Sequence, residues 1–281
     1  MTAAFADLDF ASPSPDAIAV LLAQAALAAG PAVMEVYAQG CETRTKSDGS
    51  PVTVADQRAE DIICAFLGRA RCPFPIVAEE AASAGASMAC GERFLLIDPL
   101  DGTREFIARN GEFTINVALV AGGAPVAGAV YAPALGRLWA GGAEAFVCDA
   151  APGDPLPESS RRQPIRVRVA PEGLVAIASR SHSDPQTEAF LADLPIAERR
   201  SAGSSLKFCL VAEGLADVYP RFGPTMEWDT AAGDAVLRAA GGVTLDASGA
   251  PFSYGKSAAG LRNGPFVAWG DREAAARFGH R

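Results

Sequence analysis

The chain has 281 residues, of which 49% are hydrophobic, so it can bury the core of one large domain or two smaller ones. Its formal net charge of −9 argues against broad electrostatic attraction to nucleic acid or to an anionic membrane surface. A small anionic ligand stays compatible with this charge, because a bound cation can reverse the field at one site.

The cysteines, histidines and apolar runs indicate a reduced protein without a leader. Six cysteines show no C-x-x-C spacing: Cys41, Cys64, Cys72, Cys90, Cys148 and Cys209. With only two histidines, a His-rich zinc site is not expected. The first 15 residues carry acids instead of the basic start of a signal peptide, and no apolar run is expected to span a bilayer. We therefore predict a cytoplasmic protein with no integral membrane segment; a peripheral association with the inner membrane stays open.

The residue pattern of the first half predicts helices followed by an antiparallel meander of strands. Alanine and leucine over 15–38 indicate a buried helix, and apolar residues at helical spacing indicate a second helix over 55–70. Strands ending in acidic residues are predicted at 75–80 and 93–103. Alternating patterns and Gly/Pro turns then predict strands over 113–123, 125–133 and 136–142. We place a domain boundary in the linker-like stretch 149–164, which gives domains 1–150 and 151–281.

In the second half the predicted strands and helices alternate. Strands are expected at 174–180, 216–220 and 265–270, with helices at 183–194, 203–214 and 228–242. The chain thus predicts an α/β (α+β) fold with a mixed or antiparallel N-terminal sheet half and a C-terminal α/β half.

A cluster of carboxylates follows two of the predicted strands. Glu79 ends one strand, and Asp98 and Asp101 lie three apart at the end of the next, in "DPLDGT". Carboxylates this close raise one another's pKa unless a cation neutralises them, and oxygen ligands alone favour Mg²⁺ or Mn²⁺. An Asx-type turn and helix cap is the alternative for Asp98 and Asp101 taken alone. Gly102 and Thr103 favour the metal site, because they would open a helix whose free N–H groups can hold a phosphate.

Three segments in order, "AEE", "DPLDGT" and "EWDTAAGDAVLRAAGG", resemble the signatures of the inositol monophosphatase superfamily of metal-dependent, lithium-sensitive phosphatases. The resemblance implies a layered αβαβα sugar-phosphatase fold and two or three Mg²⁺ ions, with Mn²⁺ as a possible substitute and Li⁺ and Ca²⁺ as inhibitors. The metal ligands that it implies are Glu79, Asp98, the Leu100 carbonyl, Asp101 and Asp229.

The same resemblance implies catalytic roles. Thr103, oriented by Asp56, would help to deprotonate a water held at Glu79, while the Gly102 and Thr103 amides and Asp229 contact the substrate. The metal ions would lower the pKa of that water and stabilise the leaving oxygen. Thr114 and Asn116 alternate with apolar residues in "GEFTIN", and we expect them to support the metal loop without reacting.

Segments downstream resemble one branch of that superfamily, the bacterial 3'(2'),5'-bisphosphate nucleotidases: "ASRSH", the run from Gly203 to Gly233, and "YGK". Ser204 and Lys207 are predicted to share the first turn of a helix and, with Arg221, to bind a second, non-reacting phosphate. His182 would contact the adenine. Simpler roles stay open: Ser204 as a helix cap, Lys207 on a solvated face, Arg221 paired with a surface acid and His182 in solvent.

These residues predict a Mg²⁺-dependent phosphatase that converts adenosine 3',5'-bisphosphate to AMP and phosphate, with the sulfated parent, 3'-phosphoadenosine phosphosulfate, as a further candidate. One alternative is an inositol or other sugar monophosphatase of the same superfamily, and another is a catalytically silent nucleotide-binding protein. The expected partner is a small bisphosphorylated nucleotide and not nucleic acid; the oligomeric state is left open.

Overall fold

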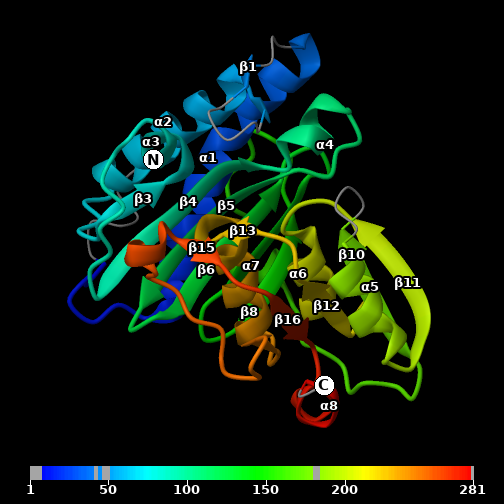
Figure 1. The fold of residues 1–281 in the computed structure, drawn as a ribbon. Helices are drawn as coiled ribbons and strands as arrows, with labels where there is room; N and C mark the ends of the chain where they lie inside the picture. Colours follow the sequence, from blue (N-terminus) through cyan, green and yellow to red (C-terminus); the bar gives the residue numbers. More distant parts are fainter. Residues whose placement is uncertain (1–7, 41–43, 46–50, 180–183, 280–281) are drawn as a thin grey trace.

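The computed structural model describes residues 8–40, 44–45, 51–179 and 184–279, and it stacks helices and sheets in five layers (Figure 1). Helices α1 and α2 cover one face of a first sheet, α6 and α7 lie between the two sheets, and α5 and α8 cover the far face of the second. Three clusters of buried apolar side chains fill the spaces between these layers. The layered α/β architecture predicted from the sequence is confirmed.

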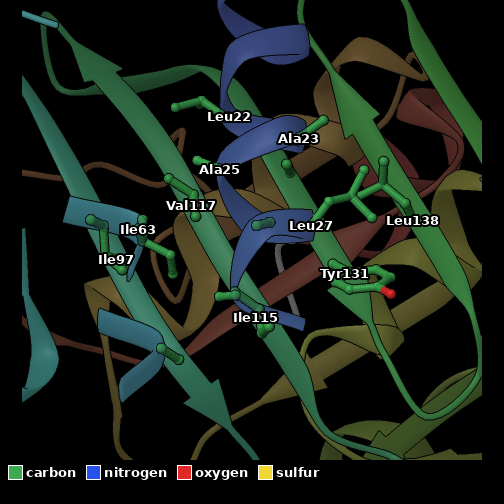
Figure 2. Close-up of a cluster of buried hydrophobic side chains, with 14 of the residues drawn as sticks. Leu22, Ala23, Ala25, Leu27, Ile63, Ile97, Ile115, Val117, Tyr131 and Leu138 are labelled. Atoms are coloured by element: carbon green, nitrogen blue, oxygen red, sulfur yellow. The ribbon is translucent and has the colours of Figure 1, made fainter. Parts of the chain in front are cut away.

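The first helix layer consists of α1 (Pro15–Gln39) and α2 (Val54–Arg69). Figure 2 shows Leu22 and Leu27 of α1 beside Ile115, Val117 and Tyr131 of the sheet. Helix α1 is 25 residues long, and its most apolar stretch of 18 residues has a mean hydropathy of 2.0, so by length and composition it could cross a membrane. The prediction that no segment is long enough was therefore wrong. In the fold, 61% of this apolar stretch is buried, as in a core helix.

The first sheet has seven strands in the order β3-β4-β5-β6-β7-β8-β9. Only β3 and β4 are parallel; the other neighbouring pairs are antiparallel. Leu95 and Ile97 face α1 and α2, whereas Phe94 and Leu96 face the middle helices, so β4 is apolar on both faces. The strands are β3 (Ile76–Ala78), β4 (Arg93–Asp101), β5 (Thr114–Ala121), β6 (Ala124–Ala132), β7 (Arg137–Gly141), β8 (Ala145–Asp149) and β9 (Gln163–Pro164).

The second sheet has five strands in the order β11-β10-β12-β16-β14, and β16 runs antiparallel to both of its neighbours. Its strands are β10 (Leu174–Ser179), β11 (Ile196–Ala202), β12 (Val218–Arg221), β14 (Val243–Asp246) and β16 (Phe266–Trp269). Its helices are α5 (Pro185–Ala192), α6 (Leu206–Ala212), α7 (Glu227–Ala239) and α8 (Arg272–Phe278). Short elements complete the fold: α3 (Glu79–Ser83), α4 (Thr103–Ile107), β1 (Arg44–Thr45) paired with β2 (Pro51–Val52), and β13 (Thr225–Met226) paired with β15 (Arg262–Asn263).

The two halves share one interior. Strand β9 follows the proposed boundary at residue 150 but pairs with β8 of the first sheet. Helix α7 packs on β5 and β6 of the first sheet and also contacts β14 of the second. The division into 1–150 and 151–281 therefore stays a proposal about sequence order, since the middle helices serve both sheets.

Candidate active site

A cleft of about 260 Å³ gathers polar residues from both halves of the chain. Its lining includes eight of the residues singled out in the sequence: Glu79, Asp101, Gly102, Thr103, Ser204, Lys207, Arg221 and Asp229. Glu79 begins α3, Asp101 ends β4, Thr103 begins α4, Lys207 is in α6 and Arg221 ends β12. Residues up to 150 apart in sequence therefore meet at one opening.

Asp98 is the most deeply buried of the predicted metal ligands, with 1% of its surface exposed. Strand β4 pairs regularly with β5 up to Asp98, which pairs with Asn116, and the register then shifts as in a β-bulge before Asp101 pairs with Thr114. Asp98 Oδ1 accepts a hydrogen bond of 3.0 Å from the Leu100 N–H. Burial, followed by repulsion from Glu79, Asp101 and Asp229 and a hydrogen bond with Glu79, raises the pKa of Asp98 well above its usual range.

Asp229 reaches the same place from α7. It is the third residue of that helix, and its Oδ2 accepts a hydrogen bond of 2.8 Å from the Met226 N–H. Burial and then the charges of Asp101 and Glu79 raise its pKa well above the usual value. The structure thus brings together four carboxylates from three elements. They are Glu79 of α3, Asp98 and Asp101 of β4, and Asp229 of α7.

The chemistry of this donor set suits divalent metal ions, although within the described residues no group of three or more carboxylate, histidine or cysteine side chains is already arranged to hold one. Every group is a hard oxygen donor, which suits Mg²⁺ or Mn²⁺, and the raised pKa of both Asp98 and Asp229 would fall again beside a cation. The Leu100 carbonyl, the predicted backbone ligand, accepts a hydrogen bond of 3.3 Å from Thr103 Oγ1. It therefore lies beside the carboxylates, at the start of α4.

Asp56 and Thr103, the predicted water-activating pair, have other hydrogen-bond partners. Asp56 Oδ2 accepts 2.8 Å hydrogen bonds from both the backbone N–H and the hydroxyl of Thr53, which closes a capping box at the start of α2. Burial raises the pKa of Asp56 to about 7 despite these bonds, and the charges of Glu80 and Glu79 add to the rise. Asp56 therefore lies close to Glu79; its contact with Thr103 stays a prediction.

Gly102 provides the turn between strand and helix. Its φ of 87° lies in the left-handed region, and an added Cβ would lie 3.3 Å from the Glu112 carbonyl oxygen. Only glycine meets both conditions without strain. The turn starts α4 at Thr103, as the sequence predicts.

Lys207 is buried, with 4% of its surface exposed, so the solvated-face alternative is wrong. Its ammonium donates to the Ser204 carbonyl at 2.5 Å and the Ala202 carbonyl at 3.4 Å, and lies 5.3 Å from the centre of the Tyr219 ring. Burial lowers its pKa to about 8, although the charge of Asp101 opposes this shift. Arg221 also lines the cleft, and in the described ranges its buried Nε has no hydrogen-bond partner.

Ser204 differs from its prediction. Helix α6 begins at Leu206 with Ser205 as the N-cap residue, so Ser204 lies before the helix instead of sharing a turn with Lys207. Its Oγ donates to Asp101 Oδ2 at 2.6 Å. His182 lies outside the described residues, so its predicted contact with the adenine stays a prediction.

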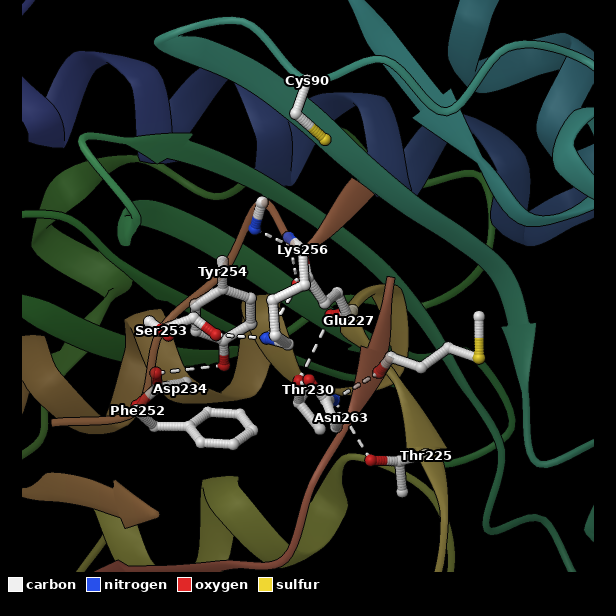
Figure 3. Close-up of polar contacts among 12 residues, drawn as sticks. Cys90, Thr225, Glu227, Thr230, Asp234, Phe252, Ser253, Tyr254, Lys256 and Asn263 are labelled. Atoms are coloured by element: carbon white, nitrogen blue, oxygen red, sulfur yellow. Dashed lines mark hydrogen bonds and ion pairs between the residues drawn. The ribbon is translucent and has the colours of Figure 1, made fainter. Parts of the chain in front are cut away.

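Two supporting residues were missed in the sequence. Glu60, 4% exposed, accepts hydrogen bonds from the backbone N–H groups of Glu80 and Ala81 at 2.7 and 2.9 Å, which holds the start of α3 and therefore Glu79. The wholly buried Glu227 similarly holds the start of α7. It accepts from the Gly255 and Lys256 N–H groups and pairs with Lys256 Nζ at 2.7 Å (Figure 3). Both glutamates are distant in sequence from the groups they hold, so no local pattern marks them.

Comparison with known proteins identifies the family. The chain belongs to the inositol monophosphatase family, whose family model matches residues 15–276. Among individual proteins, it is 45% identical over 234 residues to the 3'(2'),5'-bisphosphate nucleotidase CysQ of Escherichia coli O157:H7, which covers 82% of this chain and 91% of that protein. It is 37% identical to CysQ of Buchnera aphidicola, over 84% of this chain and 87% of that protein.

Solved structures share the fold. The crystal structure of CysQ from Bacteroides thetaiotaomicron is 39% identical and superposes with a TM-score of 0.75, covering 91% of this chain and 97% of that one. An inositol monophosphatase from Anabaena has a TM-score of 0.68 at 23% identity, over 91% of each chain, which shows the common fold alone.

Proposed function

We propose that the protein is a Mg²⁺-dependent 3'(2'),5'-bisphosphate nucleotidase that hydrolyses the 3'-phosphate of adenosine 3',5'-bisphosphate to give AMP and phosphate. The relatives named above carry this activity in their names, at 37–45% identity over most of the chain. Membership of the family supports a metal-dependent phosphatase; Mg²⁺ as the ion is our assignment from the oxygen ligands.

One observation carries the choice of substrate: a buried lysine lies in the same cleft as the carboxylates. Lys207 and Arg221 line the cleft together with Glu79, Asp101 and Asp229. Removing a cation from water costs free energy unless an anion binds to it. A bisphosphate has a second phosphate to meet it, whereas inositol 1-phosphate has none.

Divalent ions held by Glu79, Asp98, Asp101 and Asp229 would polarise a water and neutralise the charge that develops on phosphate and on the leaving oxygen. Lys207 and Arg221 bind the 5'-phosphate and so fix where the 3'-phosphate lies. The amides of Gly102 and Thr103 would hold oxygens of the 3'-phosphate, and Thr103 Oγ1 would take the proton that the attacking water loses while its own hydroxyl proton passes to the carboxylate of Asp56. Asp98, Asp101, Asp229 and Glu79 hold the ions.

A panel of phosphate esters tests this function. Phosphate release would be measured with adenosine 3',5'-bisphosphate, 3'-phosphoadenosine phosphosulfate, adenosine 3'-monophosphate and inositol 1-phosphate, in Mg²⁺ with and without Li⁺. We expect the highest kcat/KM with the adenosine bisphosphate and inhibition by Li⁺. A higher kcat/KM with inositol 1-phosphate would favour the monophosphatase alternative. Nucleotide binding without phosphate release would favour the silent binding protein.

We also assign the protein to the cytoplasm, where its thiols would stay reduced. In the described residues Cys64, Cys72, Cys90, Cys148 and Cys209 are free. Burial is the largest cause of the raised pKa of all five, which lowers their reactivity as thiolates.

A further inference from the structure

The segment 203–207, which we call the connector, departs from local preference at two neighbouring serines. Ser205 is the N-cap residue of α6, a position where a serine hydroxyl usually accepts a helix N–H. Within the described part of the chain its hydroxyl makes no such capping bond. Ser204 has a φ of 53°, a left-handed conformation that serine rarely adopts. Departures of this kind persist where the surrounding structure requires them, often at functional sites.

Both hydroxyls are directed at the proposed metal ligands instead. Ser204 Oγ donates to Asp101 Oδ2 at 2.6 Å. Ser205 Oγ lies 3.2 Å from the same oxygen and 2.7 Å from the Asp229 backbone carbonyl. Because a hydroxyl has one hydrogen, Ser205 donates to one of these acceptors at a time. The connector therefore touches ligands from β4 and from α7.

Asn116 closes this network from the first sheet. Its Nδ2 donates to Ser205 Oγ at 3.0 Å and lies 3.4 Å from Asp101 Oδ2, while its Oδ1 accepts from Thr114 Oγ1 at 3.0 Å. Asn116 and Ser205 are 1% and 2% exposed, so water does not compete for these bonds. The hydrogen bond between Asn116 and Ser205 connects the two halves of the chain beside Asp101 and Asp229.

The other end of the connector holds the buried cation. Lys207 Nζ donates to the Ser204 carbonyl, so the residue whose hydroxyl binds Asp101 also orients the lysine. The connector backbone has little freedom to adjust: the Gly203 N–H donates to Glu112 Oε2 at 2.8 Å, and a Cβ on Gly203 would lie 2.5 Å from the Glu112 carbonyl oxygen. A shift of Asp101 would therefore be passed to Lys207.

We infer that the connector couples divalent-cation binding at Asp101 and Asp229 to binding of the non-reacting phosphate at Lys207, with Ser205 and Asn116 as the positioning residues. The coupling rests on the proposed function for the identity of that phosphate. Coupling of this kind is reciprocal: if the cation tightens phosphate binding by some factor, the phosphate tightens cation binding by the same factor.

Titrations with Mn²⁺ and AMP test the inference without turnover. Mn²⁺ takes the same oxygen ligands, and its free concentration can be followed by electron paramagnetic resonance. AMP carries the non-reacting phosphate alone. In the unmodified protein we expect AMP to lower the Kd of Mn²⁺ by at least about fivefold, and Mn²⁺ to lower the Kd of AMP equally. In Ser205→Ala we expect the Kd of Mn²⁺ to rise by roughly tenfold or more, with the mutual factor reduced toward one.

Thr244→Val is the matched control, because it removes another buried hydroxyl, one that donates to Asp234 Oδ1 at 2.7 Å away from the connector. It should leave both Kd values and the mutual factor unchanged. Asn116→Ala provides a second variant if Ser205→Ala fails to fold. A Ser205→Ala protein with the Mn²⁺ affinity and mutual factor of the unmodified protein would overturn the inference. That result would also assign the coupling to direct attraction between ion and phosphate, which this variant retains.

The proposed function fails in a different way. Release of phosphate from AMP, or a lack of AMP binding in 10 mM nucleotide, would contradict the 5'-phosphate site. The effect of Ser205→Ala on Mn²⁺ alone would still show whether Ser205 and Asn116 position the metal ligands.

Discussion

Replacing Lys207 by methionine should separate the two phosphates of the substrate. Methionine is close to lysine in length and apolar, which suits a side chain that is 4% exposed and packed near Tyr219. Loss of a charge-assisted hydrogen bond costs about 1.5–3 kcal/mol, or roughly 10- to 150-fold in kcat/KM. We expect that loss with adenosine 3',5'-bisphosphate and almost none with adenosine 3'-monophosphate, which lacks the 5'-phosphate.

The same substitution should change stability with a defined pH dependence. The pKa of Lys207 is about 8 in the fold and 10.5 for an ordinary lysine. The unfolded chain therefore binds more protons between these values, so the fold gains stability as the pH rises through this window. The difference between the two pKa values corresponds to about 3 kcal/mol of unfolding free energy, and the buried charge lowers the stability of the fold by this amount below pH 8. The variant no longer has this cost, but it loses the hydrogen bonds to Ala202 and Ser204, which together stabilise the fold by about 2 kcal/mol.

Lys207→Met should therefore be about 1 kcal/mol more stable than the unmodified protein at pH 7 and less stable at pH 10.5. Urea unfolding in EDTA at several pH values would measure this crossover, and steady-state assays would compare the two nucleotides. Equal losses of kcat/KM with both nucleotides would refute the 5'-phosphate contact. A stability difference that does not change with pH would refute the buried charge.

Four other substitutions test the metal site, the packing and a buried ion pair. Asp98→Asn should abolish turnover yet raise the Tm of the metal-free protein at pH 7, because it removes a buried charge that its neighbours repel; residual activity near the unmodified level would contradict a ligand role. Gly233→Ala should destabilise the fold by about 1–3 kcal/mol, since its Cβ would meet a side-chain carbon of α6 at 2.6 Å. Gly68→Ala, on an open helix surface, should instead stabilise it by about 0.5–1 kcal/mol in the same urea titration. Lys256→Met should cost about 3 kcal/mol by leaving Glu227 buried without its ion pair. Adding Glu227→Gln should recover part of that loss; strict additivity of the two changes would show that the pair is not coupled.

The positions of the proposed metal ligands were predictable because their signals are local. Asp98, Asp101, Gly102 and Thr103 lie within one short stretch, and the end of a buried strand followed by a left-handed glycine places them at one edge of the sheet. Asp229 is similarly placed by the first turn of a long helix. Strand ends and helix starts are the points where short-range sequence patterns define direction as well as secondary structure.

Residues whose position depends on packing were not predictable in the same way. The burial of Lys207 follows from the placement of α6 between two sheets, which no pattern around residue 207 reveals. Capping preference would direct Ser205 at its own helix, whereas the tertiary structure directs it at Asp101. The charged strand β11 lies at a sheet edge and lacks the alternation that marks half-buried strands.

One local signal was present and not used. Thr53 and Asp56 have the spacing of a capping box, and the structure forms that box. The resemblance to a phosphatase family directed attention to Asp56 as a catalytic partner of Thr103. Asp56 can serve both purposes, because the hydrogen bonds from Thr53 use Oδ2 and leave the second carboxylate oxygen, Oδ1, for another contact.

The distribution of charge also bears on the order of binding. A chain with a net charge of −9 and a cleft lined by carboxylates repels a nucleotide that carries two phosphates. Four carboxylates and three cationic side chains line the cleft, the cations being Arg104, Lys207 and Arg221, so we expect productive binding of the substrate to follow the binding of divalent ions at the carboxylates. We then expect substrate selection to depend on the buried lysine in this cleft more than on the field of the whole protein. The connector between Asp101 and Lys207 provides a direct structural path by which the first event prepares the second.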